Sequence, residues 1–148
     1  MKRMLKILLL LVAGMLAAAL SGCAVNRATA TVDPSADLAA MKTMHVQRLE
    51  EDGYNVNVLI ADKLRGMGYE VSTGTEKRTD VDALVTYWDK WMWDITMYLL
   101  ELTITIRDPR TDYPLATGTS LHTSLTRKSA QGMVDEVIGN IFKGGEKE

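Results

Sequence analysis

Two neighbouring runs of alternating residues limit the fold of this chain more than any other feature. Residues 83–93 and 95–107 each place apolar side chains at every second position, which is the period of a half-buried β-strand. In the second run, the apolar side chains that alternate with charged residues and threonines are Tyr98, Leu100, Leu102, Ile104 and Ile106. Only Asp94 lies between the two runs, so the pattern predicts a hairpin with a tight reversal.

Further elements are expected on both sides of this hairpin. In chain order they are a short strand at 41–49, a helix at 56–67 that ends at Gly68, a short strand at 69–71, a strand at 115–126 and a helix that begins after Ser129. The last helix has a continuous apolar stripe, made by Met133, Val134, Val137, Ile138, Ile141 and Phe142. We therefore predict an α+β fold, a two-layer sandwich with a mostly antiparallel sheet and two helices on one face.

The amino-terminal region has the organisation of a secretory signal. Three basic residues precede an apolar run at 7–19; they are Lys2, Arg3 and Lys6. A bilayer span needs about 20 apolar residues, and this shorter run is typical of a signal peptide. The next four residues, Leu20-Ser21-Gly22-Cys23, resemble the lipobox of bacterial lipoproteins at all four positions. An ordinary signal peptide that contains a cysteine, or an uncleaved anchor, is the alternative.

The lipobox resemblance implies a covalent lipid anchor at Cys23. In that family, the cysteine sulfur receives a diacylglyceryl group, the peptide is cut before the cysteine, and the new amino group is acylated. Three acyl chains hold a protein on a membrane permanently, because each buried CH₂ contributes about 0.8 kcal/mol. Residue 24 is Ala rather than the Asp that favours retention in the inner membrane. We therefore expect the periplasmic face of the outer membrane, with the inner membrane as the alternative.

These features divide the chain into three parts. Residues 1–22 are expected to be the signal peptide, residues 23–40 a lipidated tether rich in Ala, Thr, Asp and Ser, and residues 41–145 a periplasmic α+β domain. The stretch Asp82-Ala83-Leu84-Val85-Thr86-Tyr87 resembles a strand of small periplasmic assembly lipoproteins. That group includes the amino-terminal domain of the curli secretion lipoprotein, the Tol–Pal translocation protein TolB and the lipopolysaccharide-assembly lipoprotein. The resemblance covers residues 42–142 and implies no catalytic residues.

Charge and cysteine content exclude several classes of protein. Removal of residues 1–22, which contain three basic residues and no acidic residue, changes the formal net charge from −2 to −5. An acidic domain lacks the basic surface of a nucleic-acid-binding protein, so we expect no nucleic-acid partner. Cys23 is the only cysteine, which excludes an intrachain disulfide and a cysteine-rich metal site.

The polar residues do not form a recognisable catalytic motif. The two histidines, His45 and His122, lie in different predicted strands. Ser120 and Ser124 flank His122 on one strand face, where side chains point in parallel and do not make the strand-to-helix elbow of a hydrolase. Solvated strand ends account for the aspartates that resemble a metal or acid–base set, namely Asp80, Asp82, Asp89 and Asp94. We therefore expect no enzymatic activity, no metal and no cofactor. A polar cleft that joins His122 to a carboxylate would instead favour a hydrolase.

The aromatic residues between positions 87 and 93 are the candidate contact site. Strand alternation places Tyr87, Trp91 and Trp93 on one face and Trp88 on the other, and the sequence leaves open which face is buried. Exposed Trp and Tyr are typical anchors of interfaces, so Tyr87, Trp91 and Trp93 are the predicted partner-binding residues. The alternative is that the tether, a loop or a second copy covers them.

The expected function is that of a non-enzymatic envelope lipoprotein that acts as an interaction or assembly module. Its expected partners are the membrane, through lipidated Cys23, and either envelope proteins or a second copy of the chain. The alternative is a ligand-binding lipoprotein that captures a lipid, a glycan or a small apolar molecule at the aromatic strand. A deep pocket beside Trp88 would favour this alternative, and a flat aromatic patch would favour an interaction module. A hydrolase has the least support.

Overall fold

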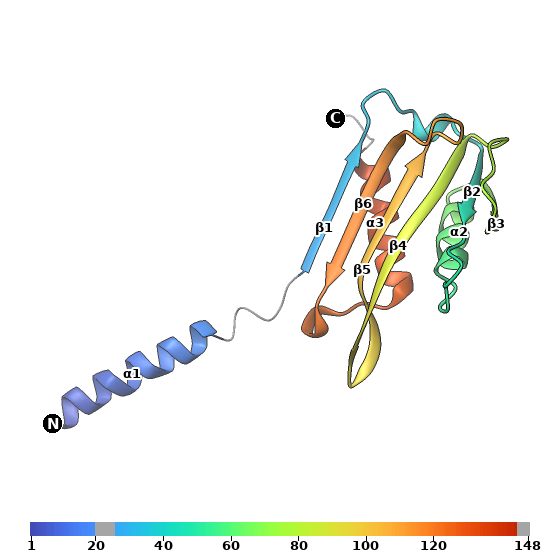
Figure 1. Ribbon diagram of the computed structural model, residues 1–148. Helices are drawn as coiled ribbons and strands as arrows, with labels where there is room; N and C mark the ends of the chain where they lie inside the picture. The colour runs from blue at the N-terminus through green and yellow to red at the C-terminus, as the bar shows by residue number, and fades with distance from the viewer. Residues whose placement is uncertain (20–25, 145–148) are drawn as a thin grey trace.

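The computed structural model describes residues 1–19 and 26–144 (Figure 1). Helix α1 (Lys2–Ala19) contains the basic residues and the apolar run of the amino terminus. None of the helices in these two segments is both long enough and apolar enough to cross a membrane. The lipobox, with the predicted lipidation site Cys23, lies outside the described residues, as do residues 145–148.

Residues 26–144 fold around a six-stranded sheet. Its strands are β1 (Asn26–Val32), β2 (Thr43–Gln47), β3 (Glu70–Gly74), β4 (Ala83–Asp94), β5 (Thr96–Arg107) and β6 (Pro114–His122). Their order across the sheet is β1-β6-β5-β4-β2-β3. The predicted hairpin is confirmed, because β4 and β5 pair antiparallel as far as Asp94 and Thr96.

The sheet is mixed, which corrects the prediction of a mostly antiparallel one. The pairs β1–β6, β6–β5 and β5–β4 are antiparallel, but β2 is parallel to both β3 and β4. Helix α2 (Val56–Gly66) connects β2 to β3. A helix in this position returns the chain to the end of the sheet where the first strand began, so the two strands run in the same direction. The α+β class is confirmed, with three α-helices among the described residues rather than two.

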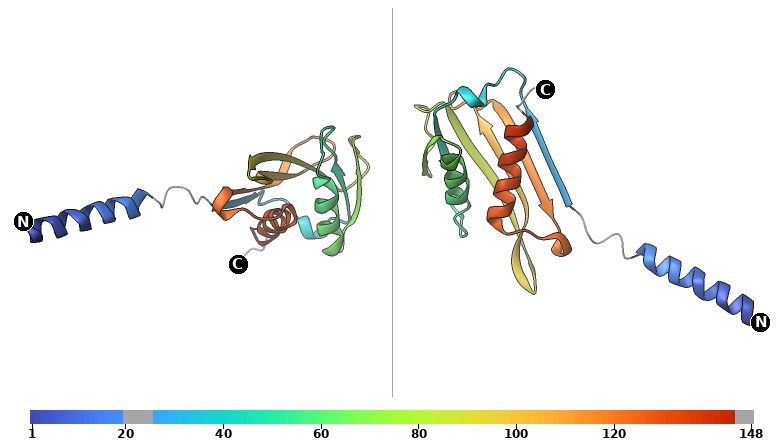
Figure 2. Two further views of the ribbon diagram at one scale, coloured as in Figure 1. Left: turned by 90° about the horizontal axis from the view of Figure 1, so that it is seen from below. Right: turned by 180° about the vertical axis from the view of Figure 1, so that it is seen from behind.

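Helices α2 and α3 (Ala130–Gly144) lie on the same face of the sheet (Figure 2). Their ends follow the sequence signals. Gly68 follows α2 with a φ of 99°, a conformation that a residue without a Cβ adopts freely. At the start of α3, the Ser129 hydroxyl accepts a hydrogen bond of 3.0 Å from the backbone N–H of Gly132. Two short 3₁₀-helices, η2 (Leu38–Ala40) and η3 (Ser124–Thr126), precede β2 and α3.

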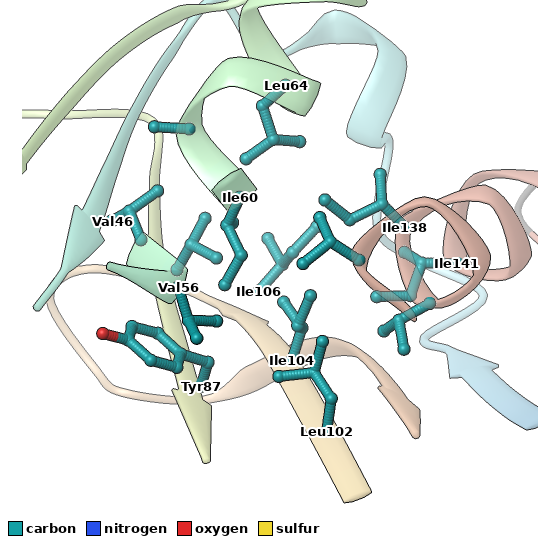
Figure 3. Packing of buried hydrophobic residues seen from close by; sticks show 14 of the residues in the cluster. Val46, Val56, Ile60, Leu64, Tyr87, Leu102, Ile104, Ile106, Ile138 and Ile141 are labelled. Carbon is teal, nitrogen blue, oxygen red and sulfur yellow. The ribbon is translucent and has the colours of Figure 1, made fainter. Parts of the chain in front are cut away.

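The hydrophobic core fills the space between these two helices and the sheet (Figure 3). It contains the predicted stripe of α3, in which Val134, Ile138 and Ile141 are fully buried. Gly118 of β6 lies beneath this stripe, where an added Cβ would come within 2.9 Å of both Val137 and Ile141. The small residues on this face of β6 therefore allow α3 to approach the sheet closely, as the sequence indicated.

The first strand changes the predicted domain boundaries. The segment expected to be a tether at 23–40 contains β1, which pairs with β6 from Asn26 opposite His122 to Val32 opposite Ala116. Ala and Thr alternate in this strand, and such small side chains hide the period of two that larger apolar residues would reveal. The folded part therefore begins at Asn26 rather than at residue 41, and the sequence leaves two residues between this strand and Cys23.

Candidate functional site

Tyr87 is part of the core and not of a contact surface. Its side chain is 5% exposed, so the prediction that Tyr87 binds a partner is wrong. The hydroxyl group donates a hydrogen bond of 2.6 Å to Oδ2 of Asp52 and accepts one of 3.2 Å from the backbone N–H of Leu49. Burial, together with the hydrogen bond to charged Asp52, raises the pKa of Tyr87.

Asp52 joins this tyrosine to the start of α2. Its buried carboxylate accepts hydrogen bonds from the Tyr87 hydroxyl and from the backbone N–H groups of Tyr54, Val56 and Asn57. Burial alone would raise the pKa of Asp52, but these four donors hold it below its ordinary value. The carboxylate thus takes the place of a side-chain cap at Asn55, which makes no such bond. This network fixes the β4 strand to α2 and has a structural role.

Trp91 is half-buried against the loop that connects β2 to α2. Its indole stacks on Tyr54 with 3.8 Å between ring centroids, and its Nε1 donates a hydrogen bond of 2.7 Å to Asp89. A β-bulge lies beside it: Lys90 pairs with Glu101, whereas Trp91 pairs with Leu99. Leu100 is therefore the extra residue of the bulge. As a result Leu99 enters the core in place of Leu100, which the unbroken alternation had predicted to be buried.

Trp93 lies near the end of the hairpin and is 69% exposed. The hairpin tip, which we define as residues 92–97, also exposes Met92, Ile95 and Met97. Ile95 stands between the paired residues Asp94 and Thr96 with a φ of 62°. Positive φ is a rare conformation for a β-branched residue. Of the three predicted partner-binding residues, Trp93 is therefore the one that the structure places fully on the surface.

Trp88 points to the face of the sheet that α2 and α3 leave open. Its neighbour Tyr87 faces the core, and successive side chains of a strand alternate, so Trp88 projects the opposite way and is 51% exposed. Thr103 of β5 pairs with it. Thr103 and Thr119 share a hydrogen bond of 3.0 Å, and Thr117 donates one of 3.3 Å to Thr105. The open face carries this one indole among threonines, and by the same alternation Leu121 lies on it as well. The four aromatic residues thus lie in four different environments and do not form one patch.

His122 does contact a carboxylate, but in a buried network. Its Nε2 lies 2.8 Å from Oε2 of Glu136, and the same oxygen accepts a hydrogen bond of 2.5 Å from the hydroxyl of Ser120. His122 and Ser120 are 1% and 0% exposed. A hydrolytic triad needs the histidine between the serine and the acid, whereas here the acid lies between the other two. The network therefore lacks the nucleophile–base contact and the open cleft of a hydrolase.

Glu136 carries the charge of this network. Burial alone would raise the pKa of Glu136, but Lys128, Ser120 and His122 stabilise the charged carboxylate and lower it to about 2. Lys128 contributes an ion pair of 2.7 Å with Oε1. Sequence patterns did not predict this cluster, because Glu136 meets Ser120 and His122 only through the packing of α3 on β6.

The other polar candidates have separate structural partners. His45 is buried, with Nδ1 at 2.8 Å from the Ser72 hydroxyl and Nε2 at 2.9 Å from the carbonyl oxygen of Glu76. The four aspartates are bound individually: Asp80 by Arg78, Asp82 by the backbone of Lys42 and Thr43, Asp89 by Trp91, and Asp94 by Ser124 and Arg127. Within residues 1–19 and 26–144, no group of three or more His, Cys, Asp or Glu residues is arranged to hold a metal ion.

Comparison with known proteins identifies a shared fold. No protein-family model and no curated protein matches the chain. The dodecamer of PelC from Paraburkholderia phytofirmans matches with a TM-score of 0.56 at 12% identity, over 84% of this chain and 99% of that chain. A PDZ domain protein from Parabacteroides distasonis matches with a TM-score of 0.52 at 12% identity, over 83% of this chain and 36% of that chain. At such low identity, these matches show similarity of fold alone.

Proposed function

We propose that the protein is a non-enzymatic outer-membrane lipoprotein that faces the periplasm and serves as an interaction or assembly module. The sequence Leu20-Ser21-Gly22-Cys23, after a basic and then apolar segment, is the observation that carries this proposal. The domain is then a two-layer sandwich in which α2 and α3 cover one face of the sheet. Its partners are the membrane, through acylated Cys23, and envelope proteins or a second copy of the chain.

The start of the fold supports attachment through Cys23. Strand β1 begins at Asn26, and all seven of its residues pair with β6. An acyl group at Cys23 would therefore be joined to the sheet through two intervening residues, without a long tether. The buried network around His122 supports a non-enzymatic role, because both Ser120 and His122 are held by Glu136 away from solvent.

Replacing Cys23 with alanine is expected to abolish processing and lipid attachment. The resemblance implies that the peptidase acts only after the thiol has been modified, so the Cys23→Ala protein should retain residues 1–22 and carry no acyl chains. Intact-mass spectrometry of the protein from cell membranes measures both changes. Ser21→Ala, which keeps a small side chain before the cleavage site, is the matched control and should be processed like the wild type. An unmodified Cys23 in mature wild-type protein would refute the proposed anchor.

The open face of the sheet supports a second candidate function, the capture of an envelope glycan. Trp88 is half exposed beside threonine hydroxyls, and an amphipathic indole next to hydroxyl groups suits a sugar ring. Trp88→Ala is then expected to abolish retention of the protein on isolated peptidoglycan while leaving its urea midpoint unchanged. Trp93→Ala, at the end of the same strand, is the control and should be retained. If Trp88→Ala is retained as well, the glycan candidate is wrong.

A further inference from the structure

The most exposed large apolar side chains of the domain gather at one end of it. Among residues 26–144, the three most exposed are Ile95 at 85%, Leu125 at 70% and Trp93 at 69%, and the others do not exceed 55%. They come from two separate parts of the chain, the hairpin tip and η3. We refer to Trp93, Ile95 and Leu125 together as the apolar end.

Polar contacts hold the two parts of the apolar end together. The Ser124 hydroxyl donates a hydrogen bond to Asp94, and Arg127 donates one of 2.9 Å to the hydroxyl of Thr96. The guanidinium of Arg127 also lies 4.8 Å from the centre of the Tyr98 ring. The hairpin tip is thus fixed against η3 at its base, while Trp93 and Ile95 are exposed to solvent.

The apolar end is also the end at which the folded chain begins. Asn26 pairs with His122, two residues before η3. Figure 1 shows the start of β1, the hairpin tip and the connection from β6 to α3 together at the lower end of the sheet. Cys23 precedes Asn26 by three residues, which span at most about 11 Å of extended chain. The proposed lipid anchor and the apolar end therefore lie on the same side of the domain.

The conformation of Ile95 is a second, independent sign. A β-branched residue at a φ of 62° is strained. The side chain of Ile95 is also 85% exposed, so its apolar surface stays in contact with water. Such strain persists at sites where it contributes to function. Backbone strain and an exposed apolar side chain thus occur together at Ile95, at the tip of the hairpin. Asparagine or glycine at this position would relieve both.

We propose that the apolar end inserts into the surface of the lipid bilayer to which Cys23 is attached. Trp93 then lies in the interfacial region that indoles prefer, and Ile95 and Leu125 reach the acyl chains. The strands would rise from the membrane, with the opposite end of the sheet presented to the periplasm. This inference rests on the proposed lipidation of Cys23.

Fluorescence quenching by brominated lipid tests the insertion. The lipidated protein is purified in detergent and reconstituted into vesicles of phosphatidylethanolamine and phosphatidylglycerol, with plain or brominated acyl chains. One variant keeps Trp93 as its only tryptophan (Trp88→Phe with Trp91→Phe). The matched variant keeps Trp88 (Trp91→Phe with Trp93→Phe), an exposed indole farther along the same strand. Brominated chains should roughly halve the emission of Trp93 and leave that of Trp88 nearly unchanged.

A further variant and a mass measurement separate the possible outcomes. In the protein that keeps only Trp93, Ile95→Asn removes the apolar side chain at a position where asparagine tolerates positive φ, and it should reduce the quenching of Trp93. If Cys23 is acylated by mass spectrometry but Trp93 is quenched no more than Trp88, the inference is wrong and the proposed anchor stands. If Cys23 is not acylated, both the proposed anchor and the inference about insertion are wrong. Crosslinks between the tips of two copies, without quenching, would assign the apolar end to self-association instead.

Discussion

Replacing Ile138 with alanine is expected to lower the free energy of unfolding by about 2 to 5 kcal/mol. Ile138 is 1% exposed and packs in the core between α3 and the sheet. The smaller side chain removes apolar contacts and leaves a cavity. Helix α3 cannot shift to fill this cavity, because it already packs closely on the sheet at Gly118. Urea denaturation followed by circular dichroism measures the change.

Val58→Ala in α2 is the control for this experiment. Val58 is 41% exposed, so its truncation should change the free energy of unfolding by less than about 0.5 kcal/mol. An Ile138→Ala protein with the same urea midpoint as the control would show that the apolar stripe of α3 is not packed against the sheet in solution.

Replacing Glu136 with glutamine is expected to destabilise the protein at neutral pH and to have little effect in acid. The pKa of the carboxyl group falls from its ordinary value of 4.5 to about 2 on folding, and each pKa unit corresponds to about 1.4 kcal/mol. The charged carboxylate therefore contributes up to about 3 kcal/mol above pH 5. Protonation removes this contribution as the pH falls towards 2, because the unfolded state binds the proton more tightly.

The measurement is the difference in unfolding free energy between the wild type and Glu136→Gln at several pH values. This difference should be largest near neutral pH and shrink progressively between about pH 5 and pH 2. Asp135→Asn removes the adjacent carboxylate, whose ion pair with Lys63 is at the surface, and should have a small effect at each pH. A wild-type advantage over Glu136→Gln that is constant across this range would contradict the predicted role of the charge.

Local patterns in the sequence predicted the elements whose side chains are large and regularly spaced. The apolar stripe of α3 and the alternation in β5 identified a helix and a strand that bury one face each, and both are present. The same approach missed β1, because alanines and threonines give a weak contrast between the two faces of a strand. It also missed the bulge at Leu100, since an extra residue in one strand is defined only by the partner strand.

Contacts between distant segments limited the prediction of the candidate site. Tyr87 and Trp93 lie on the same strand and share the same alternation. Tyr87 is nevertheless buried and bound to Asp52, whereas Trp93 is 69% exposed among the described residues. The direction of β2 relative to β4 depends on how the chain between them, which contains α2 and β3, crosses the sheet. The spacing of apolar residues does not reveal this path. The approach of Glu136 to His122 likewise requires the packing of α3 on β6.

The pairing of β1 also sets an order of events during folding. β1 lies at an edge of the sheet and pairs with β6, so the first strand of the domain must wait for one of the last. In a chain that is secreted from its amino terminus, residues 26–32 have no strand to pair with until residues 114–122 have emerged. Such a distant pairing also carries a large entropic cost of loop closure and forms late. If Cys23 is lipidated as proposed, an enzyme that acts before residues 114–122 emerge would meet an unpaired segment at residues 26–32.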